Sequence, residues 1–497
     1  MEIIASYVPA PGRDPRTELA SPPPGATMVE LRADLVGSGA DLAPLIGACP
    51  LPVVLTLRSA AEGGRGPDDS ALRRDFFTGA RALDAAFFDL ERRDIELLDV
   101  VVPRERAILS AHLPPATRPA DLEATAAQLL ALGSRLVKVV SQATTLADVL
   151  AVLSLASAAA RGGRNHRRLI VFATGDAGRA TRLLSPLLAA PIAYAAWDAG
   201  RAAAPGQYTP AELTALIGHL GGRPRRLFAV LGRPSAASLS PRMHAAAYRA
   251  LGLPNLFVPI EVSDAAELAT LLRPMGETSV DDAGFLAGGF AVTMPWKEAA
   301  AKRCDVLAPR AQRAAAANTV LPRAGKTLGD CTDIDGISRV IVESGVAIEG
   351  AAALVLGTGG AARAAVVALQ LAGAEVAVAG RDRAAAEGMA RRLAAAVADP
   401  ADSERAAVVV NATPAGRDGA PAPWLEALRA PAGALAIDLP YGEQPTFLEQ
   451  LAGARGWSYA GGREVLLFQG VSQFAAMNGV APPVRAMAAA LGLEEES

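Results

Sequence analysis

Short apolar runs alternate with longer amphipathic stretches over about the first 200 residues of the chain. Two of the longer stretches, residues 71–84 and 121–132, are rich in alanine and leucine and have the length of helices. Eight alternations of strand and helix are typical of a (β/α)8 barrel, so the pattern predicts that fold. The eight runs are Ile3–Val8, Met28–Asp34, Pro52–Arg58, Ala86–Glu91, Ala107–His112, Arg135–Val140, Leu169–Thr174 and Ile192–Trp197.

A different pattern begins after residues 220–226, a bridge rich in glycine, proline and arginine that predicts a linker. An apolar strand starts at Leu227, and a later strand at 351–356 leads through glycines into an apolar-faced helix. Strand, glycine-rich turn and helix in this order indicate a Rossmann nucleotide-binding unit. We therefore expect an α/β protein, with a TIM barrel over 1–219 and a second α/β unit after the linker.

Composition narrows the classes of function. At 497 residues the chain is long enough for two or three domains, and its net charge of -3 gives no basic surface for nucleic acid. The N-terminus lacks the pattern of a secretory signal, and no apolar run reaches the roughly 18–20 residues of a membrane span. Cys49, Cys304 and Cys331 show neither metal-ligand spacing nor an even disulfide set, so we expect a soluble cytoplasmic protein without a metal.

Lysine is scarce, and its few positions point to chemistry. Four lysines stand against 44 arginines. Only an amine can condense with a ketone or lose its proton near neutral pH, whereas a guanidinium stays charged. Lys138 interrupts the run R-L-V-K-V-V and Lys297 closes G-F-A-V-T-M-P-W-K, both in apolar frames, while Lys302 and Lys326 lie in helical and turn-like surroundings.

Ionisable residues gather where the predicted barrel strands end. Glu30 and Arg32 end the second run, Arg58 ends the third, His112 ends the fifth, and Lys138 lies within the sixth. The carboxyl ends of barrel strands converge on one mouth, so these side chains are expected to meet around a small ligand.

The combination of Lys138 and His112 indicates imine chemistry on a ketone. Burial among leucine and valine is expected to lower the pKa of Lys138 and leave a nucleophilic neutral amine. A histidine at the neighbouring strand end can move protons at neutral pH. Taken singly, a lysine that reaches solvent and a capped core histidine are alternatives, and a class I aldolase would also use a strand lysine.

Several segments of the first half resemble the type I 3-dehydroquinate dehydratases, over roughly residues 2–210. They are V-E-L-R-A-D (29–34), L-T-L-R-S-A-A-E-G-G (55–64), I-L-S-A-H (108–112), L-V-K-V-V (136–140), G-D-A-G-R-A-T-R-L-L-S-P (175–186) and A-A-P-G-Q (203–207). The resemblance implies that Lys138 forms a Schiff base with the substrate, that His112 moves the protons and that Glu62 orients His112. It implies that Arg182 holds the ring carboxylate through two hydrogen bonds. The other implied substrate ligands are Glu30, Arg32, Arg58 and Gln207.

The nucleotide motif of the second half lies in the strand–turn–helix context that it requires. Gly357, Gly359 and Ala362 fill a G-x-G-x-x-G/A frame, which lets a pyrophosphate approach the helix N-terminus. The next strand ends at Arg381-Asp382-Arg383. Two arginines there favour the 2'-phosphate of NADP, whereas Asp382 keeps NAD open as an alternative.

Further segments of the second half resemble the shikimate dehydrogenases, over about residues 227–490. They are L-G-R-P-S-A-A-S-L-S-P-R-M-H (231–244), G-F-A-V-T-M-P-W-K-E-A-A (289–300), A-A-N-T-V (316–320), C-T-D-I-D-G (331–336), V-N-A-T-P-A-G (410–416), I-D-L-P-Y (437–441) and F-Q-G-V-S-Q-F (468–474). The resemblance implies a substrate-binding catalytic domain over 227–325, a Rossmann NADP domain over 326–440 and a C-terminal segment over 441–497 that returns to the catalytic domain.

The shikimate dehydrogenase resemblance also implies roles for single residues. Lys297 and Asp333 would form the proton-transferring pair beside the reacting C–O group. Ser238 and Ser240 would hold the substrate carboxylate; as an alternative, S-L-S-P merely caps a helix starting at Pro241. A separate alternative is that Lys297-Glu298 is merely the exposed start of a helix. The remaining implied substrate ligands are Thr293, Asn318, Tyr441 and Gln469, and the implied cofactor ligands are Gly357, Gly359, Gly360, Ala361, Arg363, Arg381, Arg383, Asn411 and Thr413.

Both halves depart from their family patterns at binding positions. Ala203 stands where the dehydratases usually have a serine. Ala291 and Cys331 stand where the dehydrogenases usually have asparagine, and Pro414 stands where serine is usual. These changes remove hydrogen-bonding groups and are expected to weaken binding or alter the substrate.

Together the two resemblances imply consecutive steps of one pathway. The barrel would dehydrate 3-dehydroquinate to 3-dehydroshikimate, and the second half would reduce that ketone with NADPH to shikimate. Two alternatives stay open: one half is non-catalytic, or it acts on a related ring acid such as quinate. We expect small-molecule substrates, no nucleic-acid or membrane partner, and no transit peptide before the barrel.

Overall fold

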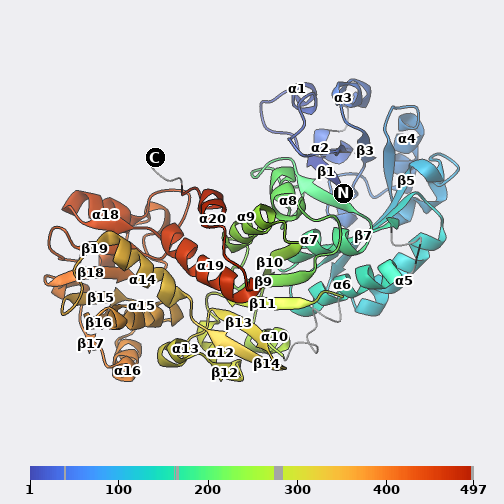
Figure 1. Ribbon diagram of the computed structural model, residues 1–497. Coiled ribbons are helices and arrows are strands. Elements are labelled where there is room, and N and C mark those ends of the chain that lie inside the picture. The colour runs from blue at the N-terminus through green and yellow to red at the C-terminus, as the bar shows by residue number, and fades with distance from the viewer. Residues whose placement is uncertain (38–40, 162, 164–166, 274–283, 494–497) are drawn as a thin grey trace. The chain divides into compact units, whose positions relative to one another are not determined.

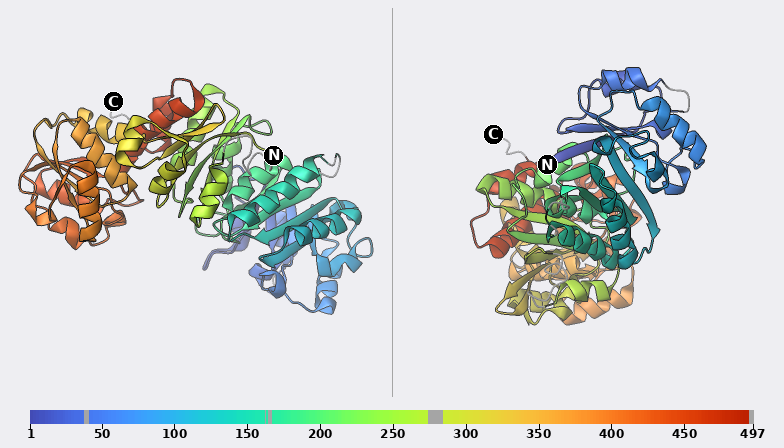
Figure 2. Two further views of the ribbon diagram at one scale, coloured as in Figure 1. Left: turned by 90° about the horizontal axis from the view of Figure 1, so that it is seen from below. Right: turned by 90° about the vertical axis from the view of Figure 1, so that its right-hand side faces the viewer.

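The computed structural model describes residues 1–37, 41–161, 163, 167–273 and 284–493, and the chain divides into two compact units (Figures 1 and 2). The first unit is built on Met1–Arg225 and the second on the chain from Arg226 onward. Two short stretches, Val258–Ser263 and residues 284–285, group with the first unit.

The first unit is a nearly closed barrel of eight parallel strands. Its pairings run in the order β7-β6-β5-β4-β3-β2-β1-β8, so that β1 lies between β2 and β8. The strands are β1 Glu2–Tyr7, β2 Met28–Arg32, β3 Val53–Thr56, β4 Phe87–Glu91, β5 Ala107–Pro115, β6 Leu136–Gln142, β7 Leu169–Thr174 and β8 Ile192–Ala196. All eight predicted apolar runs therefore form strands.

Helices follow the barrel strands, and α1, α3, α4 and α8 begin at side-chain caps. The Asp69 carboxylate accepts hydrogen bonds from the backbone N–H groups of Ala71 and Leu72 at the start of α4. Such caps satisfy donors that have no partner within the helix. The helices of this unit are α1 Pro15–Leu19, α2 Ala33–Val36, α3 Leu42–Ala48, α4 Ser70–Ala80, α5 Pro119–Ala131, α6 Leu146–Arg161, α7 Arg179–Leu188 and α8 Pro210–Ile217.

The second unit has two lobes, each with a six-stranded sheet. The sheet of the first lobe is mixed, in the order β10-β9-β11-β13-β14-β12. Its strands are β9 Arg226–Gly232, β10 Asn255–Glu261, β11 Ala287–Val292, β12 Val306–Leu307, β13 Thr319–Arg323 and β14 Lys326–Asp330. Its helices are α9 Ser240–Leu251, α10 Ala265–Leu271, α12 Lys297–Arg303 and α13 Pro309–Ala314.

The sheet of the second lobe is parallel throughout, in the order β17-β16-β15-β18-β19-β20. Its central strands are nearly free of polar residues, as expected for strands covered on both faces. The strands are β15 Ala352–Leu356, β16 Glu375–Ala379, β17 Ala396–Val397, β18 Ala406–Asn411, β19 Leu435–Asp438 and β20 Ser458–Ala460. The helices are α14 Asp333–Ser344, α15 Gly360–Leu371, α16 Arg383–Leu393, α17 Pro423–Glu426 and α18 Phe447–Arg455.

The chain returns to the first lobe through α19 (Gly462–Asn478) and α20 (Val484–Ala490). Phe474 on α19 and Met487 on α20 are buried in one cluster with Phe228 of β9 (Figure 1). Strand β20 still belongs to the parallel sheet, and helix α18 packs against it. The return to the first lobe therefore begins after β20 rather than at the expected residue 441. A strand pattern alone does not reveal which sheet the strand joins.

The expected fold class is confirmed: an N-terminal α/β barrel precedes a two-lobed α/β unit with a Rossmann lobe. No helix within the described ranges is long and apolar enough to cross a membrane.

Candidate active sites

Lys138 and His112 lie on neighbouring barrel strands with their side chains on one face. Ser110 of β5 is the register partner of Lys138 on β6, and His112 follows Ser110 by two residues. Because side chains alternate along a strand, Ser110 and His112 share a face. The strand pairing therefore brings the two expected proton-moving residues together, with His112 nearer the carboxyl end.

The surroundings of Lys138 are charged rather than apolar. Its Nζ donates to Asp89 Oδ2 at 2.5 Å, lies 3.8 Å from Glu30 Oε1 and stands 4.6 Å from the centre of the Tyr194 ring. The expectation that apolar side chains surround the amine is therefore wrong for this structure. The valines next to Lys138 in sequence alternate with it on the strand, and so their side chains do not surround the amine.

Arg58 is the hub of the buried charges. Its guanidinium lies 2.9 Å from Asp89, 3.1 Å from Glu91 and 3.1 Å from Glu62, and it donates to Ser110 at 3.1 Å. Burial alone would raise the pKa of Asp89, but the charges of Arg58 and Lys138 outweigh it and hold that pKa well below its usual value. Asp89 thus stays ionised and anchors both cations.

Glu62 orients the His112 ring, as its family role implies. Glu62 Oε2 lies 2.8 Å from His112 Nδ1 and accepts the His112 backbone N–H at 3.1 Å. With Nδ1–H donated to the carboxylate, Nε2 is left as the acceptor nitrogen. Burial, followed by the charges of Arg58 and Lys138, lowers the pKa of His112, so that its ring is neutral and can accept a proton.

Arg182 on α7 is a buried cation whose hydrogen-bonding capacity is largely unused. Its Nε and one terminal nitrogen have no partner among the described residues, and the other terminal nitrogen lies 3.5 Å from Pro205 O. The guanidinium stacks 4.5 Å over Phe172. Burial lowers the pKa of Arg182 to about 9. A buried, unpaired guanidinium is well suited to receive an anion.

The A-P-G-Q segment is held close to the barrel mouth. Gly206 has a φ of 78°, and a Cβ there would lie 2.7 Å from Gly175 O, so only glycine fits. Gln207 Oε1 accepts the N–H groups of Ala203 at 2.7 Å and Ala204 at 3.2 Å. The Gln207 amide nitrogen is thereby directed away from its own turn.

Glu30 and Arg32, the two site candidates of the second run, take different partners. Glu30 accepts hydrogen bonds from Ser6 at 2.6 Å and Thr56 at 2.9 Å inside the barrel. Arg32 forms a paired contact with Asp34, at 2.9 and 2.7 Å. Glu30 therefore belongs to the Lys138 cluster, whereas the Arg32 guanidinium is already occupied by a carboxylate.

Sequence reasoning missed Asp89 and Glu91 on β4 and Ser110 on β5. Their signal was present, because Phe87–Glu91 reads F-F-D-L-E and places two carboxylates two residues apart in an otherwise apolar strand. Both are completely buried. Buried carboxylates on one face of a strand require cations nearby. Arg58 and Lys138, which were already predicted at the barrel mouth, could have been proposed as those cations.

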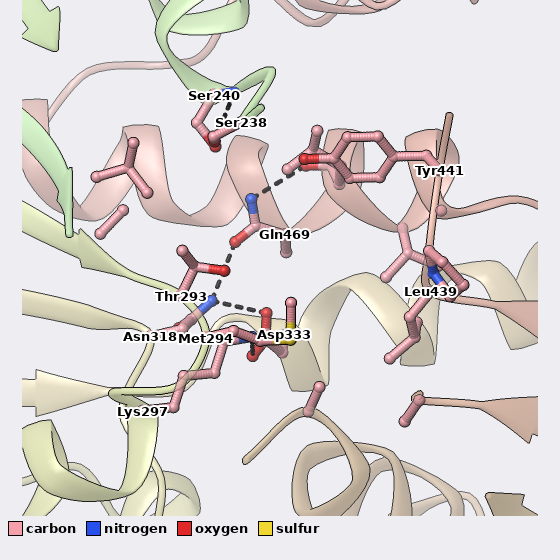
Figure 3. A pocket seen from close by; sticks show the side chains of 18 of the residues that line it. Ser238, Ser240, Thr293, Met294, Lys297, Asn318, Asp333, Leu439, Tyr441 and Gln469 are labelled. Carbon is pink, nitrogen blue, oxygen red and sulfur yellow. Dashed lines mark hydrogen bonds and ion pairs between the residues drawn. The ribbon is translucent and has the colours of Figure 1, made fainter. Parts of the chain in front are cut away.

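The second unit contains a cavity of about 200 Å³ lined by both of its lobes (Figure 3). Eight residues expected at the site converge there, and Ala361 and Thr413 of the expected cofactor set line it too. The eight are Ser238, Ser240, Thr293, Lys297, Asn318, Asp333, Tyr441 and Gln469.

One ion pair and a chain of amides organise this cavity. Lys297 Nζ lies 2.6 Å from Asp333 Oδ2, and Asn318 Nδ2 donates to Asp333 Oδ1 at 2.9 Å and to Gln469 Oε1 at 3.0 Å (Figure 3). Lys297 does begin α12, as the local alternative had it, but its ammonium is paired rather than exposed. The chain fixes Asp333 in position from two sides.

Hydroxyl groups lie at another part of the cavity. Ser240 begins α9 and its N–H donates to Ser238 Oγ at 3.3 Å, so the S-L-S-P segment does start a helix. Burial raises the pKa of Tyr441, while contacts with Leu239 and Ser238 and the charge of Arg417 act in the opposite direction. Tyr441 therefore stays a neutral donor beside the serines.

The glycine turn after β15 leads into a helix whose first N–H groups have no side-chain cap. Gly357 has a φ of 116°, and Gly359 precedes α15 without any side-chain cap. A Cβ at Gly360 would lie 2.7 Å from Lys297 Cβ, so the turn packs directly on the lysine. Uncapped N–H groups at the start of a helix suit a phosphate, and these residues fit a dinucleotide.

The strand end after β16 lies beside the glycine turn. A Cβ at Gly380 would stand 2.8 Å from the Thr358 side chain, which places the exposed Arg381 next to the turn. Asp382 caps α16 by accepting the Ala385 N–H at 3.0 Å. Arg383 lies 3.4 Å from Glu387 on the helix surface.

The other expected cofactor residues have structural partners. Arg363 lies 3.1 Å from Glu298. Asn411 is buried; its amide donates to Asp438 at 2.8 Å and its oxygen accepts from Thr413 Oγ1 at 2.6 Å. Asn411 therefore shapes the A-T-P-A-G turn that brings Thr413 to the cavity.

The family departures fall at distinct places. Ala291 and Pro414 line the cavity, whereas Cys331 is fully buried and does not line it. Among the lining residues that sequence reasoning missed, Arg417 is the charged one. Its signal was its place directly after a turn at the carboxyl end of a parallel strand, where α/β sheets bind ligands.

Fold and site geometry together define a class: a fusion of a lysine-bearing (β/α)8 barrel with a two-lobed Rossmann unit. Residues 17–223 match the family model of type I 3-dehydroquinase, and residues 230–320 match that of the shikimate dehydrogenase substrate binding domain. The chain therefore belongs to the type I 3-dehydroquinases in its first half and to the shikimate dehydrogenases in its second.

Relatives join the same two parts. The "Pentafunctional AROM polypeptide" of Candida glabrata is 29% identical over 88% of this chain and 28% of its own. The "Bifunctional 3-dehydroquinate dehydratase/shikimate dehydrogenase, chloroplastic" of Arabidopsis thaliana is 28% identical over 72% of this chain and 61% of its own. The chain thus spans under two thirds of these relatives' lengths.

Among solved structures, a shikimate 5-dehydrogenase from Thermus thermophilus in complex with NADP(H) and shikimate is 34% identical, with a TM-score of 0.48. The match covers 54% of this chain and 98% of that one.

Proposed function

We propose that the chain is a bifunctional enzyme that converts 3-dehydroquinate through 3-dehydroshikimate to shikimate. The observation that carries the proposal is that each half pairs one lysine, buried in the barrel and half-buried in the cavity, with one proton-moving group. His112 accompanies Lys138 in the barrel, and Asp333 accompanies Lys297 in the cavity. A non-catalytic half would have no reason to keep such a pair.

In the barrel, Lys138 would lose its proton to a carboxylate of its cluster and attack the ketone carbon of 3-dehydroquinate. Loss of the carbonyl oxygen as water gives an iminium, which acidifies the neighbouring C–H. His112 Nε2 would take that proton, and the ring hydroxyl would leave as water with a proton returned by His112. Hydrolysis of the imine restores Lys138 and releases 3-dehydroshikimate.

The substrate carboxylate would occupy Arg182, whose Nε and one terminal nitrogen have no partner among the described residues. Asp89 would hold the iminium as it holds the ammonium, because the positive charge stays at the same nitrogen. Glu30, Arg58 and Gln207 would contact ring hydroxyl groups, and Glu62 would keep the His112 ring in its acceptor form.

In the second unit, Ser238 and Ser240 would bind the ring carboxylate and Thr293, Asn318, Tyr441 and Gln469 the remaining polar groups. Lys297 would donate a proton to the ketone oxygen as it becomes an alcohol, and Asp333 would hold the ammonium in place. A nicotinamide cofactor supplies a hydride when bound. The glycine turn would hold its pyrophosphate through Gly357, Gly359, Gly360 and Ala361, and Asn411, Thr413 and Arg363 would flank it.

NADP is the proposed cofactor, because Arg381 is exposed beside the glycine turn and Arg383 is nearby. Asp382 already accepts a helix N–H, which leaves it poorly placed for a ribose hydroxyl. Arg381→Ala should raise the KM for NADPH by roughly tenfold, the scale of a charged hydrogen bond, and leave that for NADH unchanged. Equal use of both cofactors by the wild type would contradict the proposal.

Trapping tests the imine. Borohydride added during dehydration should increase the intact mass by that of the reduced adduct, located on Lys138. Lys138→Ala should abolish both adduct and dehydration while keeping the NADPH-dependent reduction of 3-dehydroshikimate. Dehydration that persists without Lys138 would refute the mechanism. Quinate, tested beside shikimate, decides the ring-acid alternative.

The free cysteines favour a reducing compartment, and we propose a cytoplasmic enzyme whose partners are its small-molecule substrates.

A further inference from the structure

Arg417 is a charged residue of the second-unit cavity that neither the motifs nor the proposed chemistry uses. It lines the cavity and is half-buried. Its Nε is buried without a hydrogen-bond partner within the described part of the chain. An unpartnered guanidinium in a partly enclosed site costs free energy unless something occupies it, so its presence calls for an anion.

The charge balance of the cavity singles out Arg417. Only three of the described lining residues carry a formal charge, and two of them, Lys297 and Asp333, neutralise each other at 2.6 Å. Arg417 supplies the remaining positive charge. The net charge of the lining is therefore +1, which suits one bound carboxylate.

The loop that carries Arg417 is fixed on both sides. Gly416 has a φ of 81°, and its carbonyl accepts the Phe447 N–H at 2.8 Å. Asp418 Oδ1 accepts the N–H groups of Glu443 at 2.9 Å and Gln444 at 3.2 Å. Anchors immediately before and after Arg417 set the direction of its side chain in advance, which lowers the entropy lost on binding.

Arg417 lines the same cavity as Tyr441, Ser238 and Ser240, which indicates the ligand group that it can reach. Its charge acts on the hydroxyl of Tyr441, and that hydroxyl in turn contacts Ser238 and the backbone of Leu239. Ser238 and Ser240 are the groups proposed for the ring carboxylate. The cofactor phosphates belong instead at the turn Gly357–Gly360, which does not include Arg417.

We propose that Arg417 is a charged ligand of the carboxylate of the ring acid in this cavity, added to the neutral donors Ser238 and Ser240. The inference rests on the proposed function and deepens it. The Rossmann lobe thereby contributes directly to substrate binding, since Arg417 follows β18 whereas the two serines belong to the first lobe. Specificity for acids over their neutral esters would reside largely in this one side chain.

Steady-state oxidation of shikimate at saturating NADP+ tests the proposal. Arg417→Met should raise the KM for shikimate by roughly 10- to 100-fold, the range of hydrogen bonds to a charged group, with little change in kcat. The KM of Arg417→Lys should lie between those of the wild type and Arg417→Met, because lysine keeps the positive charge but not the paired donors of a guanidinium. Arg391→Met, which removes an exposed arginine of α16, should leave the KM unchanged.

The methyl ester of shikimate tests whether Arg417 binds the carboxylate. The wild type should prefer the acid strongly, and the preference should shrink by roughly 10- to 100-fold in Arg417→Met, because the ester has no charge to lose. Equal losses for acid and ester would overturn the proposal. So would an increase in the Kd for NADPH, titrated by its fluorescence, with the KM for shikimate unchanged.

Failure of the function and failure of this inference look different. A wild-type chain that neither binds nor oxidises shikimate would refute the proposed function, and this inference with it. A wild type that turns over normally beside an Arg417→Met variant with wild-type KM would refute only the role of Arg417. Thermal unfolding of each variant, with Arg417→Lys as the conservative one, checks that the second unit is folded.

Discussion

The two candidate sites build proton transfer around a lysine in opposite ways. In the barrel, Lys138 and Arg58 share a buried set of carboxylates, and nearly every charge has a counter-charge within 4 Å. In the second unit, the one ion-pair partner of Lys297 within the described ranges is Asp333, and neutral amides complete the arrangement. The proposed chemistry accounts for the difference. A lysine that becomes covalently bound must keep its charge partners through every intermediate, whereas a lysine that only passes a proton needs one.

The two sites also differ in the arginine that is proposed to bind the substrate carboxylate. Arg182 is fully buried and its pKa falls to about 9, so that solvent cannot satisfy it. Arg417 is half-buried and borders an open cavity. The barrel therefore holds a buried, uncompensated cation before substrate binds. Its substrate-free state carries a greater electrostatic cost than that of the second-unit cavity.

Crossed alanine substitutions should produce the largest effects. His112→Ala should lower kcat for dehydration by about 10²–10⁴-fold, and Lys297→Ala should do the same to ketone reduction, the usual scale of a lost acid–base group. Each variant should leave the other activity intact and serves as its control. Measuring both activities on each purified chain checks this, and a single substitution that impairs both would break the picture of two separate sites.

Replacing each lysine by methionine should lower the free energy of unfolding by different amounts in the two units. Lys138→Met leaves Asp89 and Glu30 short of a cation and should destabilise the barrel by about 3–5 kcal/mol, as for a broken buried pair. Lys297→Met leaves Asp333 with Asn318 and some solvent and should cost about 1 kcal/mol. Urea unfolding followed for each unit measures both. Equal costs would show that the barrel cluster tolerates loss of a cation.

Acid should reduce the Lys138→Met effect. The folded-state pKa of Asp89 is depressed, so its stabilising contribution is present above its unfolded pKa of about 3.9 and is lost as pH falls towards the folded value. The wild type and Lys138→Met should therefore converge in stability below about pH 4. A difference that does not shrink as pH falls below about 4 would locate the effect in packing rather than in charge.

The sequence predicted the scaffold and the lysines more fully than their surroundings. The run Leu169–Thr174 is β7 residue for residue, because apolar periodicity reports burial directly. Lys138 and Lys297 were found through their rarity in this composition. Asp89 was missed, and the amine environment was misjudged, because the neighbours of a strand side chain come from adjacent strands and not from adjacent residues. Arg417 was missed because it belongs to no motif, and among 44 arginines only its place after a turn at the carboxyl end of a parallel strand distinguishes it.

Dehydration should depend on pH through Glu62. Burial raises the pKa of Glu62 to about 7, against the partial opposition of Arg58. His112 needs the ionised carboxylate as the acceptor of its Nδ1–H, so kcat/KM should rise with pH by up to tenfold per unit below about 7. Glu62→Gln should remove this rise. Among its described residues the second unit has no histidine paired with a carboxylate. Its reduction kinetics should therefore lack this rise, and the comparison can be made on the same chain.

The sign for stability is the reverse of that for activity. A carboxyl group whose folded pKa lies above its unfolded value of about 4.3 stabilises the fold fully below that value and loses the contribution as pH rises through about 7. The barrel should therefore give up some stability in the range where its catalytic histidine becomes correctly oriented. Thermal unfolding between pH 5 and pH 8 should show a smaller loss in Glu62→Gln.

The smallest expected effects come from the two alanines at binding positions. Ala291 lines the cavity, and Ala203 donates its N–H to Gln207 without offering a side-chain group. Ala291→Asn and Ala203→Ser should each lower the KM of their own half by about two- to tenfold, the value of one hydrogen bond to a neutral hydroxyl at roughly 0.5–1.5 kcal/mol. Each unchanged half is the control for the other. If a half has lost its chemistry, one added donor will not create turnover; and if Ala291→Asn lowers activity on shikimate, the cavity is shaped for a different ring acid, because the new amide then takes space that the natural substrate uses.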